Sequence, residues 1–202
     1  MSVKLIWVTP DAEKQILYMA RVSSNNQTSS DTRLMRYLIK HKHWSPFEMA
    51  NMCVEIETSR AISAQIIRHR SFSFQEFSQR YAQTHEIEVY RGRRQDLKNR
   101  QNSVDDLEDS TQRWWRDAQN EVNSLSLNLY QEALDRGVAK ECARMLLPMS
   151  STTKLYMNGT IRSWVHYLSL RLDSGTQLEH RELAEEIKTI LIEQLPTLAE
   201  VL

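Results

Sequence analysis

The chain has 202 residues, with 26 Lys and Arg against 26 Asp and Glu, and 41% of its residues are hydrophobic. This composition is typical of a globular protein and excludes a disordered chain and a global polyanion-binding surface. The N-terminus lacks a signal-peptide core, no apolar run approaches membrane-spanning length, and the two cysteines form no disulfide framework. We therefore expect a single domain over residues 1–202 in the reducing cytoplasm.

The predicted elements of the first half alternate between strand and helix. In chain order they are a strand over 3–8, a helix from Thr9 to about Arg21, a polar loop over 23–32, a helix over 31–42, a half-buried strand over 52–57, a helix from about Ser59 and a return strand over 87–89. Thr9 followed by Pro10 is typical of a helix N-cap and first turn. Ser45-Pro46-Phe47-Glu48 matches a capping box with proline at the first helical position.

Helices dominate the second half. A polar excursion over 91–113 precedes predicted helices over 115–133, over 139–147, from about 160 and over 176–194. The basic run of Arg91, Arg93 and Arg94 is interpreted as a solvated loop rather than a nucleic-acid contact. Gly137 is a natural helix stop. An apolar stripe, interpreted as core, consists of Trp115, Ala118, Val122, Leu125, Leu129 and Ala133. These elements predict an α+β fold: a helix-rich single domain with a small, mostly antiparallel sheet.

The stretch from Arg68 to Arg80, here called the arginine motif, carries the strongest functional signal. Arg68-His69-Arg70 stands seven residues before Ser78, and Gln65 is spaced to share a helical face with its first two members. Arginine forks bind phosphate oxygens bidentately, and a serine hydroxyl can complete a phosphate cradle. The motif therefore predicts a site for a phosphorylated ligand, with a solvated basic turn as the alternative.

A second group of cationic side chains follows near the C-terminus. Arg144 lies near the end of its predicted helix, whereas Arg162, His166 and Ser169 are spaced along one helix face, with Arg171 beyond them. Such a face by itself is typical of solvent exposure. Together with the arginine motif, it indicates one or more ligands that carry phosphates and flat rings.

The histidines and cysteines form no recognisable catalytic centre. His41 and His43 make a His-x-His pair, but the spacings of a zinc site are missing, so we expect no metal. The other histidines are His69, His85, His166 and His180. Neither Cys53 nor Cys142 has a neighbouring histidine in sequence that would lower its thiol pKa, and both are interpreted as core residues.

Five ordered blocks of the sequence resemble the flavin-dependent (alternative) thymidylate synthases. The arginine motif resembles the signature of that family. The other blocks are Ala20-Arg21-Val22-Ser23, Lys40-His41-Lys42-His43-Trp44-Ser45-Pro46-Phe47-Glu48, Ala143-Arg144-Met145-Leu146-Leu147-Pro148, and Gly159-Thr160-Ile161-Arg162-Ser163-Trp164-Val165-His166-Tyr167 followed by Leu170-Arg171. Their order over most of the chain makes coincidence remote. Met49 departs from the family, in which many members have histidine there, and His166 stands where some have asparagine.

The resemblance implies the fold of the thymidylate synthase complementing proteins and an FAD-dependent thymidylate synthase, which is a methyltransferase. In the implied reaction dUMP becomes dTMP, 5,10-methylenetetrahydrofolate donates the carbon, FAD carries a hydride supplied by NADPH, and tetrahydrofolate is released. The resemblance also implies a homotetramer with active sites at subunit interfaces, and no nucleic-acid or membrane partner. Such sites would gather cationic patches that are dispersed along a chain of zero net charge.

The resemblance assigns residue roles by matched position. The dUMP set is Gln65, Arg68, Glu76, Phe77, Ser78, Gln79, Arg80, Arg144 and Arg171. The FAD set is Ser45, Arg68, His69, Arg70, Glu76, Thr160, Ile161, Arg162 and His166, with Ser23 as a weaker member. The catalytic candidates are Arg171, which would stabilise the ionised N3 of dUMP, and His43, which would lie near flavin and folate. The resemblance implies no cysteine nucleophile, and Ser78, without a basic partner in the motif, is interpreted as a dUMP contact.

Two other classes of function stay open from the residues alone. A non-catalytic nucleotide- or RNA-binding module would use the same arginines, and its affinity would fall steeply with salt. A metal-dependent phosphohydrolase would use the histidines, and a chelator would inactivate it.

Overall fold

A computed structural model of the chain describes residues 1–84, 86–200 and 202. The chain forms two compact units: unit 1 is Met1–Ile56, Ile67–Gln75 and Tyr156–Leu202, and unit 2 is Glu57–Ile66 and Glu76–Leu155. The single domain over 1–202 stays a prediction. None of the helices in the described ranges is both long and apolar enough to span a membrane.

A four-stranded sheet has the order β1-β2-β6-β3. Its strands are β1 (Ser2–Val8), β2 (Asn51–Ser59), β6 (Thr152–Thr160) and β3 (Ser73–Glu76). β2 and β6 are antiparallel, because the Arg60 N–H donates to the Ser151 carbonyl beyond one end of the pair and the Ile161 N–H donates to the Ala50 carbonyl beyond the other. The predicted helix-rich fold with a small antiparallel sheet is confirmed.

Two strands of this sheet have no counterpart among the predicted elements. β6 buries Thr153, Leu155 and Met157 in alternation, which is the period-two signal of a strand. β3 lies inside the arginine motif and is only four residues long. The predicted return strand over 87–89 is wrong, since the structure has only an isolated bridge between Ile87 and Ser151.

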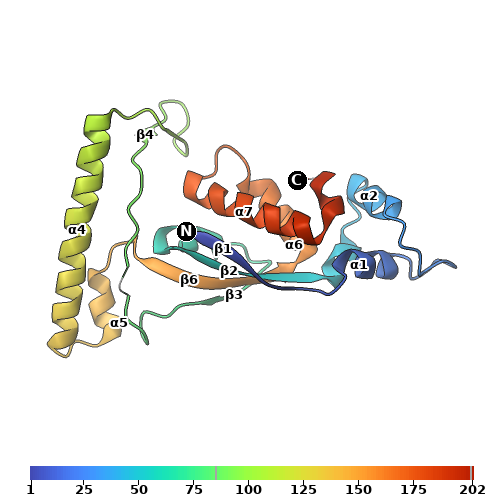
Figure 1. The fold of residues 1–202 in the computed structure, drawn as a ribbon, viewed down its shortest axis with the longest axis horizontal. Coiled ribbons are helices and arrows are strands. Elements are labelled where there is room, and N and C mark those ends of the chain that lie inside the picture. Colours follow the sequence, from blue (N-terminus) through green and yellow to red (C-terminus); the bar gives the residue numbers. More distant parts are fainter. Residues whose placement is uncertain (85, 201) are drawn as a thin grey trace. The chain divides into compact units, whose positions relative to one another are not determined.

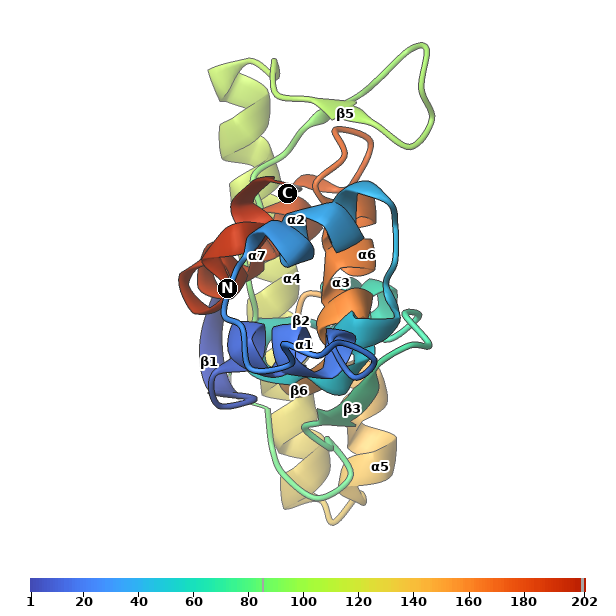
Figure 2. The same cartoon turned by 90° about the vertical axis from the view of Figure 1, so that its right-hand side faces the viewer.

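Unit 1 packs helices against β1 and the first part of β2. They are α1 (Ala12–Ala20), α2 (Arg33–Lys40), α6 (Ile161–Arg171) and α7 (Leu178–Gln194), with 3-10 turns η1 (Ser45–Met49) and η3 (Pro196–Glu200). α7 packs on β1 and α6, and both α1 and α6 contact η1 (Figures 1 and 2). Ile161, Trp164, Val165 and Leu168 of α6 are buried, as their helical spacing predicts.

Both predicted N-caps in unit 1 are wrong. α1 begins after Asp11, which has a left-handed backbone (φ 50°), two residues later than Thr9 would cap it. Thr9 instead joins the sheet edge, where its Oγ1 accepts from the Asn51 N–H at 2.9 Å. Ser45 lies inside the 3-10 turn η1, whose N-cap position is occupied by Trp44. For Thr9, a side-chain and backbone partner from a distant segment overrides the local cap pattern.

Unit 2 contains the long helix α4 and several short elements. They are α3 (Arg60–Ile66), the hairpin β4 (Arg94–Gln95) and β5 (Ser103–Val104), α4 (Asp109–Asp135), α5 (Lys140–Ala143) and η2 (Arg144–Leu146). α5 packs beside α4 (Figure 1). The helix predicted over 139–147 is therefore two short pieces. Gly137 adopts φ 84° just past α4, which confirms the predicted stop.

The apolar stripe of α4 is not core in this chain. Val122 is 54% exposed, Leu125 is 58% exposed and Leu129 is 41% exposed. The predicted burial of this stripe is therefore wrong for the single chain. The periodicity correctly predicts a helix with one apolar face, but a period does not say what covers that face.

Candidate functional site

The first part of the arginine motif forms a turn in unit 1. α3 ends at Ile66, so Arg68, His69 and Arg70 follow the helix and do not continue it. The prediction that the helix presents Arg68 and His69 on one face with Gln65 is therefore wrong. Arg68 and Arg70 are exposed and His69 is half-buried. The turn closes with a hydrogen bond from the Phe72 N–H to the His69 carbonyl at 3.2 Å.

His69 contacts Arg171 at the C-terminal end of α6. The Arg171 Nε donates to the His69 Nε2 at 2.8 Å. Burial, and then the charge of Arg171, lowers the pKa of His69 from its ordinary value to about 4. His69 is therefore neutral at physiological pH and serves as an acceptor. A residue of the predicted FAD set and a residue of the predicted dUMP set thus meet across 102 positions of sequence.

The N-terminal half of α6 carries the other FAD candidates of the C-terminal block. Thr160 caps α6, with its Oγ1 accepting from the Ser163 N–H at 3.2 Å. Ile161 is fully buried and its N–H donates to the Ala50 carbonyl, so its side chain faces the core. Arg162 and His166 are exposed on the opposite side. These placements leave the two exposed side chains as the ones that can reach a ligand directly.

Arg162 also links α6 to η1. It forms an ion pair with Glu48, which stands three residues after the FAD candidate Ser45. Ser45 and the catalytic candidate His43 are both exposed. The His43 ring lies 6.0 Å from the Tyr37 ring, centroid to centroid. Unit 1 therefore holds the predicted FAD residues from three separated segments: the 43–48 block, the turn after α3 and the start of α6.

Glu76 is held by a cluster within unit 2. Its Oε1 accepts from the Ser63 Oγ at 2.7 Å and from the Thr153 Oγ1 at 3.0 Å, and the Arg60 Nη1 lies 3.0 Å away. Arg60 also donates to the Phe77 carbonyl at 2.8 Å. Sequence reasoning missed these three partners of Glu76, and no local spacing rule links them to it. The cluster supplies an ion pair and two hydrogen bonds to a half-buried carboxylate at the start of the 76–80 segment of the dUMP set.

The remaining dUMP candidates lie in unit 2, and two of them, Arg80 and Arg144, contact α5. Arg80 forms an ion pair with Glu141 at 3.0 Å, and the Arg144 Nε donates to the Glu141 carbonyl at 3.2 Å. Gln79 is buried and donates to Thr84 Oγ1 at 3.1 Å, whereas Ser78 is half-buried. Gln65 is half-buried on α3. Arg80 and Arg144, 64 positions apart in the sequence, thus both contact Glu141, one at its carboxylate and the other at its carbonyl.

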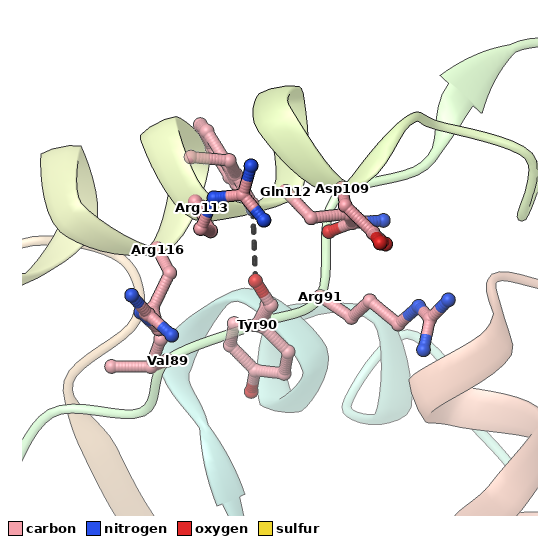
Figure 3. Close-up of a pocket in the computed structure, with 8 residues that line it drawn as sticks. Val89, Tyr90, Arg91, Asp109, Gln112, Arg113 and Arg116 are labelled. Carbon is pink, nitrogen blue, oxygen red and sulfur yellow. Dashed lines mark hydrogen bonds between the residues drawn. The ribbon is translucent and has the colours of Figure 1, made fainter.

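A surface pocket of about 340 Å³ lies elsewhere in unit 2, at the start of α4 (Figure 3). Its lining includes Arg91, Arg113, Arg116 and Trp115. The basic run beside it is paired within the 91–113 excursion. Arg91 pairs with Asp105, Arg93 donates to Ser103 Oγ, and Arg94 pairs with Asp106.

The titratable side chains offer no second reactive centre among the described residues. No cluster of three or more His, Cys, Asp or Glu able to hold a metal occurs in the described ranges, and His85 lies outside them. Cys53 is buried, and burial raises the pKa of its thiol. Cys142 is exposed, so its predicted core position is wrong.

The chain matches the family model described as thymidylate synthase complementing protein over residues 4–197. It is 53% identical over 191 residues to the flavin-dependent thymidylate synthase of Synechocystis sp., an alignment that covers 94% of this chain and 89% of the relative. It is 50% identical to the probable flavin-dependent thymidylate synthase of Paramecium bursaria Chlorella virus 1, with 100% of this chain and 99% of the relative covered. A crystal structure of the UMP/dUMP methylase PolB from Streptomyces cacaoi, bound with 5-Br dUMP, matches with a TM-score of 0.85 at 26% identity, over 99% of this chain and 93% of that one. The chain therefore belongs to the thymidylate synthase complementing protein family, the flavin-dependent thymidylate synthases.

Proposed function

We propose that this chain converts dUMP to dTMP, with 5,10-methylenetetrahydrofolate as carbon donor and NADPH as the source of reducing equivalents. The observation that carries the proposal is the hydrogen bond between Arg171 and His69. It joins a residue assigned to the uracil ring with a residue assigned to the flavin. An enzyme that moves a hydride from a flavin to a pyrimidine adduct needs these two binding surfaces in contact.

Arg171 is the proposed catalytic residue for dUMP. Its Nε is engaged by His69, so its two Nη groups remain as the donors that can reach the N3 edge of the pyrimidine. A fixed guanidinium beside N3 stabilises the ionised ring, which is the more nucleophilic form. Arg68, Arg80 and Arg144 supply guanidinium donors suited to the phosphate. His43, exposed near Tyr37, is the second catalytic candidate.

The donor chemistry of unit 1 fits FAD. Arg68 and Arg70 are exposed on one turn, and Arg162 and His166 are exposed on α6, so guanidinium and imidazole donors are available to a pyrophosphate and a flavin ring. FAD, when bound and reduced, supplies the hydride. The chain's own residues bind and orient it, with the exposed Ser45 as a hydroxyl contact and Thr160 holding the start of α6. The buried Cys53, whose thiol pKa is raised, fits a reaction without a cysteine nucleophile.

We further propose a homotetramer whose active sites lie at subunit interfaces. The exposed stripe of α4 supports this, because Trp115, Val122 and Leu129 recur every seven residues, with Ala118 and Leu125 between them. That 3–4 spacing is typical of a helix–helix seam, and an uncovered stripe of this kind on one chain marks a contact with another. A cytoplasmic location stays a prediction.

The proposed function is tested by measuring dTMP formation in a reconstituted reaction mixture. The purified protein, loaded with FAD, is incubated with dUMP, methylenetetrahydrofolate and NADPH, and dTMP is quantified with each component omitted in turn. We expect dTMP only in the complete mixture. A folded, FAD-loaded protein that makes no dTMP would contradict the proposal. Nucleic-acid binding with steep salt dependence, or phosphate release abolished by a chelator, would then point to one of the two alternative classes.

A further inference from the structure

A buried pair of titratable side chains lies behind the contact between His69 and Arg171. Tyr167 on α6 and His180 in the first turn of α7 are both 0% exposed. The Tyr167 Oη and the His180 Nε2 are 3.0 Å apart. The predicted site residues include neither of them. Two buried polar groups that satisfy each other are costly to separate, because each would otherwise lose its hydrogen bond in a low-dielectric interior.

Tyr167 connects this pair to His69. The two rings meet edge-to-face, with centroids 4.8 Å apart and planes at 74°. Tyr167 and Arg171 are four residues apart on α6, so they project from the same side of the helix. One helix therefore carries both the ring that supports His69 and the guanidinium that donates to it.

The orientation of the His69 ring determines whether it can hold Arg171. A guanidinium can only donate, so the His69 Nε2 must be the acceptor and the proton of the neutral ring must lie on Nδ1. A half-turn of the ring would put a carbon where Nε2 stands and remove the acceptor. The ring of Tyr167, packed against His69, opposes such a rotation. The hydrogen bond to His180 in turn holds Tyr167 in place.

We propose that Tyr167 and His180 are positioning residues for Arg171, acting through the orientation of His69. The role of Arg171 rests on the function proposed above. With Nε held by His69, the Nη groups of Arg171 are presented to the pyrimidine without the cost of ordering them at each turnover. Misplacing a reacting or stabilising group by about 1 Å can cost up to about 10²-fold in rate.

Two single variants and the corresponding double variant distinguish a positioning role of this pair from a purely structural one. Tyr167→Phe keeps the ring and removes the hydroxyl, His180→Leu removes the imidazole, and each breaks the hydrogen bond between the two side chains. The double variant removes both groups, so its urea midpoint should recover toward that of the wild type. We expect dTMP turnover to fall on the order of tenfold in all three, with FAD per chain unchanged. His180→Gln, which keeps a polar group near the hydroxyl, should be faster than His180→Leu. If turnover recovers together with the midpoint in the double variant, the pair is only structural and the proposal is overturned.

A readout independent of activity is the tautomer of His69. Nitrogen NMR of protein labelled in histidine should show one His69 tautomer, protonated on Nδ1, in the wild type. The double variant should show a mixture of both tautomers. An unchanged single tautomer in a slow variant would overturn the proposed route through His69. A wild type that shows the single tautomer but makes no dTMP would contradict the proposed function and not the positioning of Arg171.

Discussion

Lowering the pH should reduce the free energy of unfolding, because the folded protein keeps His180 neutral. This side chain is fully buried, and burial, followed by the charges of Arg171 and His69, lowers its pKa from the ordinary 6.5 to about 3. At pH values between these two pKa values, His180 is protonated in the unfolded chain and neutral in the folded chain. The contribution to stability is therefore complete above the unfolded pKa and is lost progressively as the pH falls toward 3.

The size of the effect follows from the two pKa values. Between pH 7 and pH 5, this one site should cost the folded state about 2 kcal/mol. The comparison is between the wild type and His180→Gln, which cannot titrate but keeps a polar partner for the Tyr167 hydroxyl. The other histidines titrate in both proteins, so the difference between the two isolates His180.

Urea unfolding followed by circular dichroism at pH 5, 6 and 7, at one protein concentration, measures this difference. We expect the wild type to lose about 2 kcal/mol more than His180→Gln on going from pH 7 to pH 5. Equal losses in the two proteins would refute the reasoning, because they would mean that His180 is protonated as easily in the folded chain as in the unfolded one.

Four substitutions test other parts of the structure. Gly159→Ala places a Cβ about 2.4 Å from the Phe72 ring, so we expect a loss of about 1–3 kcal/mol in the free energy of unfolding, measured in urea, and an unchanged value would contradict the packing. Arg171→Ala should lower turnover on the order of 10²–10³-fold while flavin absorbance per chain stays constant, and surviving activity would exclude the role at N3. Arg68→Lys should weaken dUMP binding by calorimetry about tenfold or more, because an ammonium cannot replace the planar fork; an unchanged affinity would argue against bidentate binding. Leu125→Glu should yield species smaller than a tetramer in sedimentation velocity, and an intact tetramer would exclude the α4 seam.

Helices with a complete apolar face were predictable from the sequence. In α6, Ile161, Trp164 and Leu168 have helical spacing and are buried, because a single face meets the core. The signal for β6 was also present, since Leu155 and Met157 alternate with less buried neighbours. β3 offered less, because a polar four-residue strand is defined by its neighbours in the sheet and not by its own composition.

In the candidate site, too, local spacing predicted which residues share a helix face but missed the contacts between separate elements. Spacing placed Arg162 and His166 on one exposed face of α6, and the structure confirms that placement. The partners of Glu76 and the bond between Arg171 and His69 come from different elements, and no rule of spacing within one element connects them. The exposed stripe of α4 marks another limit, since periodicity describes a face without identifying what covers it.

The central claim is that this chain methylates dUMP reductively, with a flavin as hydride carrier. The most direct measurement is the ratio of folate product to dTMP under saturating NADPH. The account predicts one tetrahydrofolate for each dTMP and no accumulation of dihydrofolate. Dihydrofolate formed in step with dTMP would contradict it, because the folate itself would then have supplied the hydride.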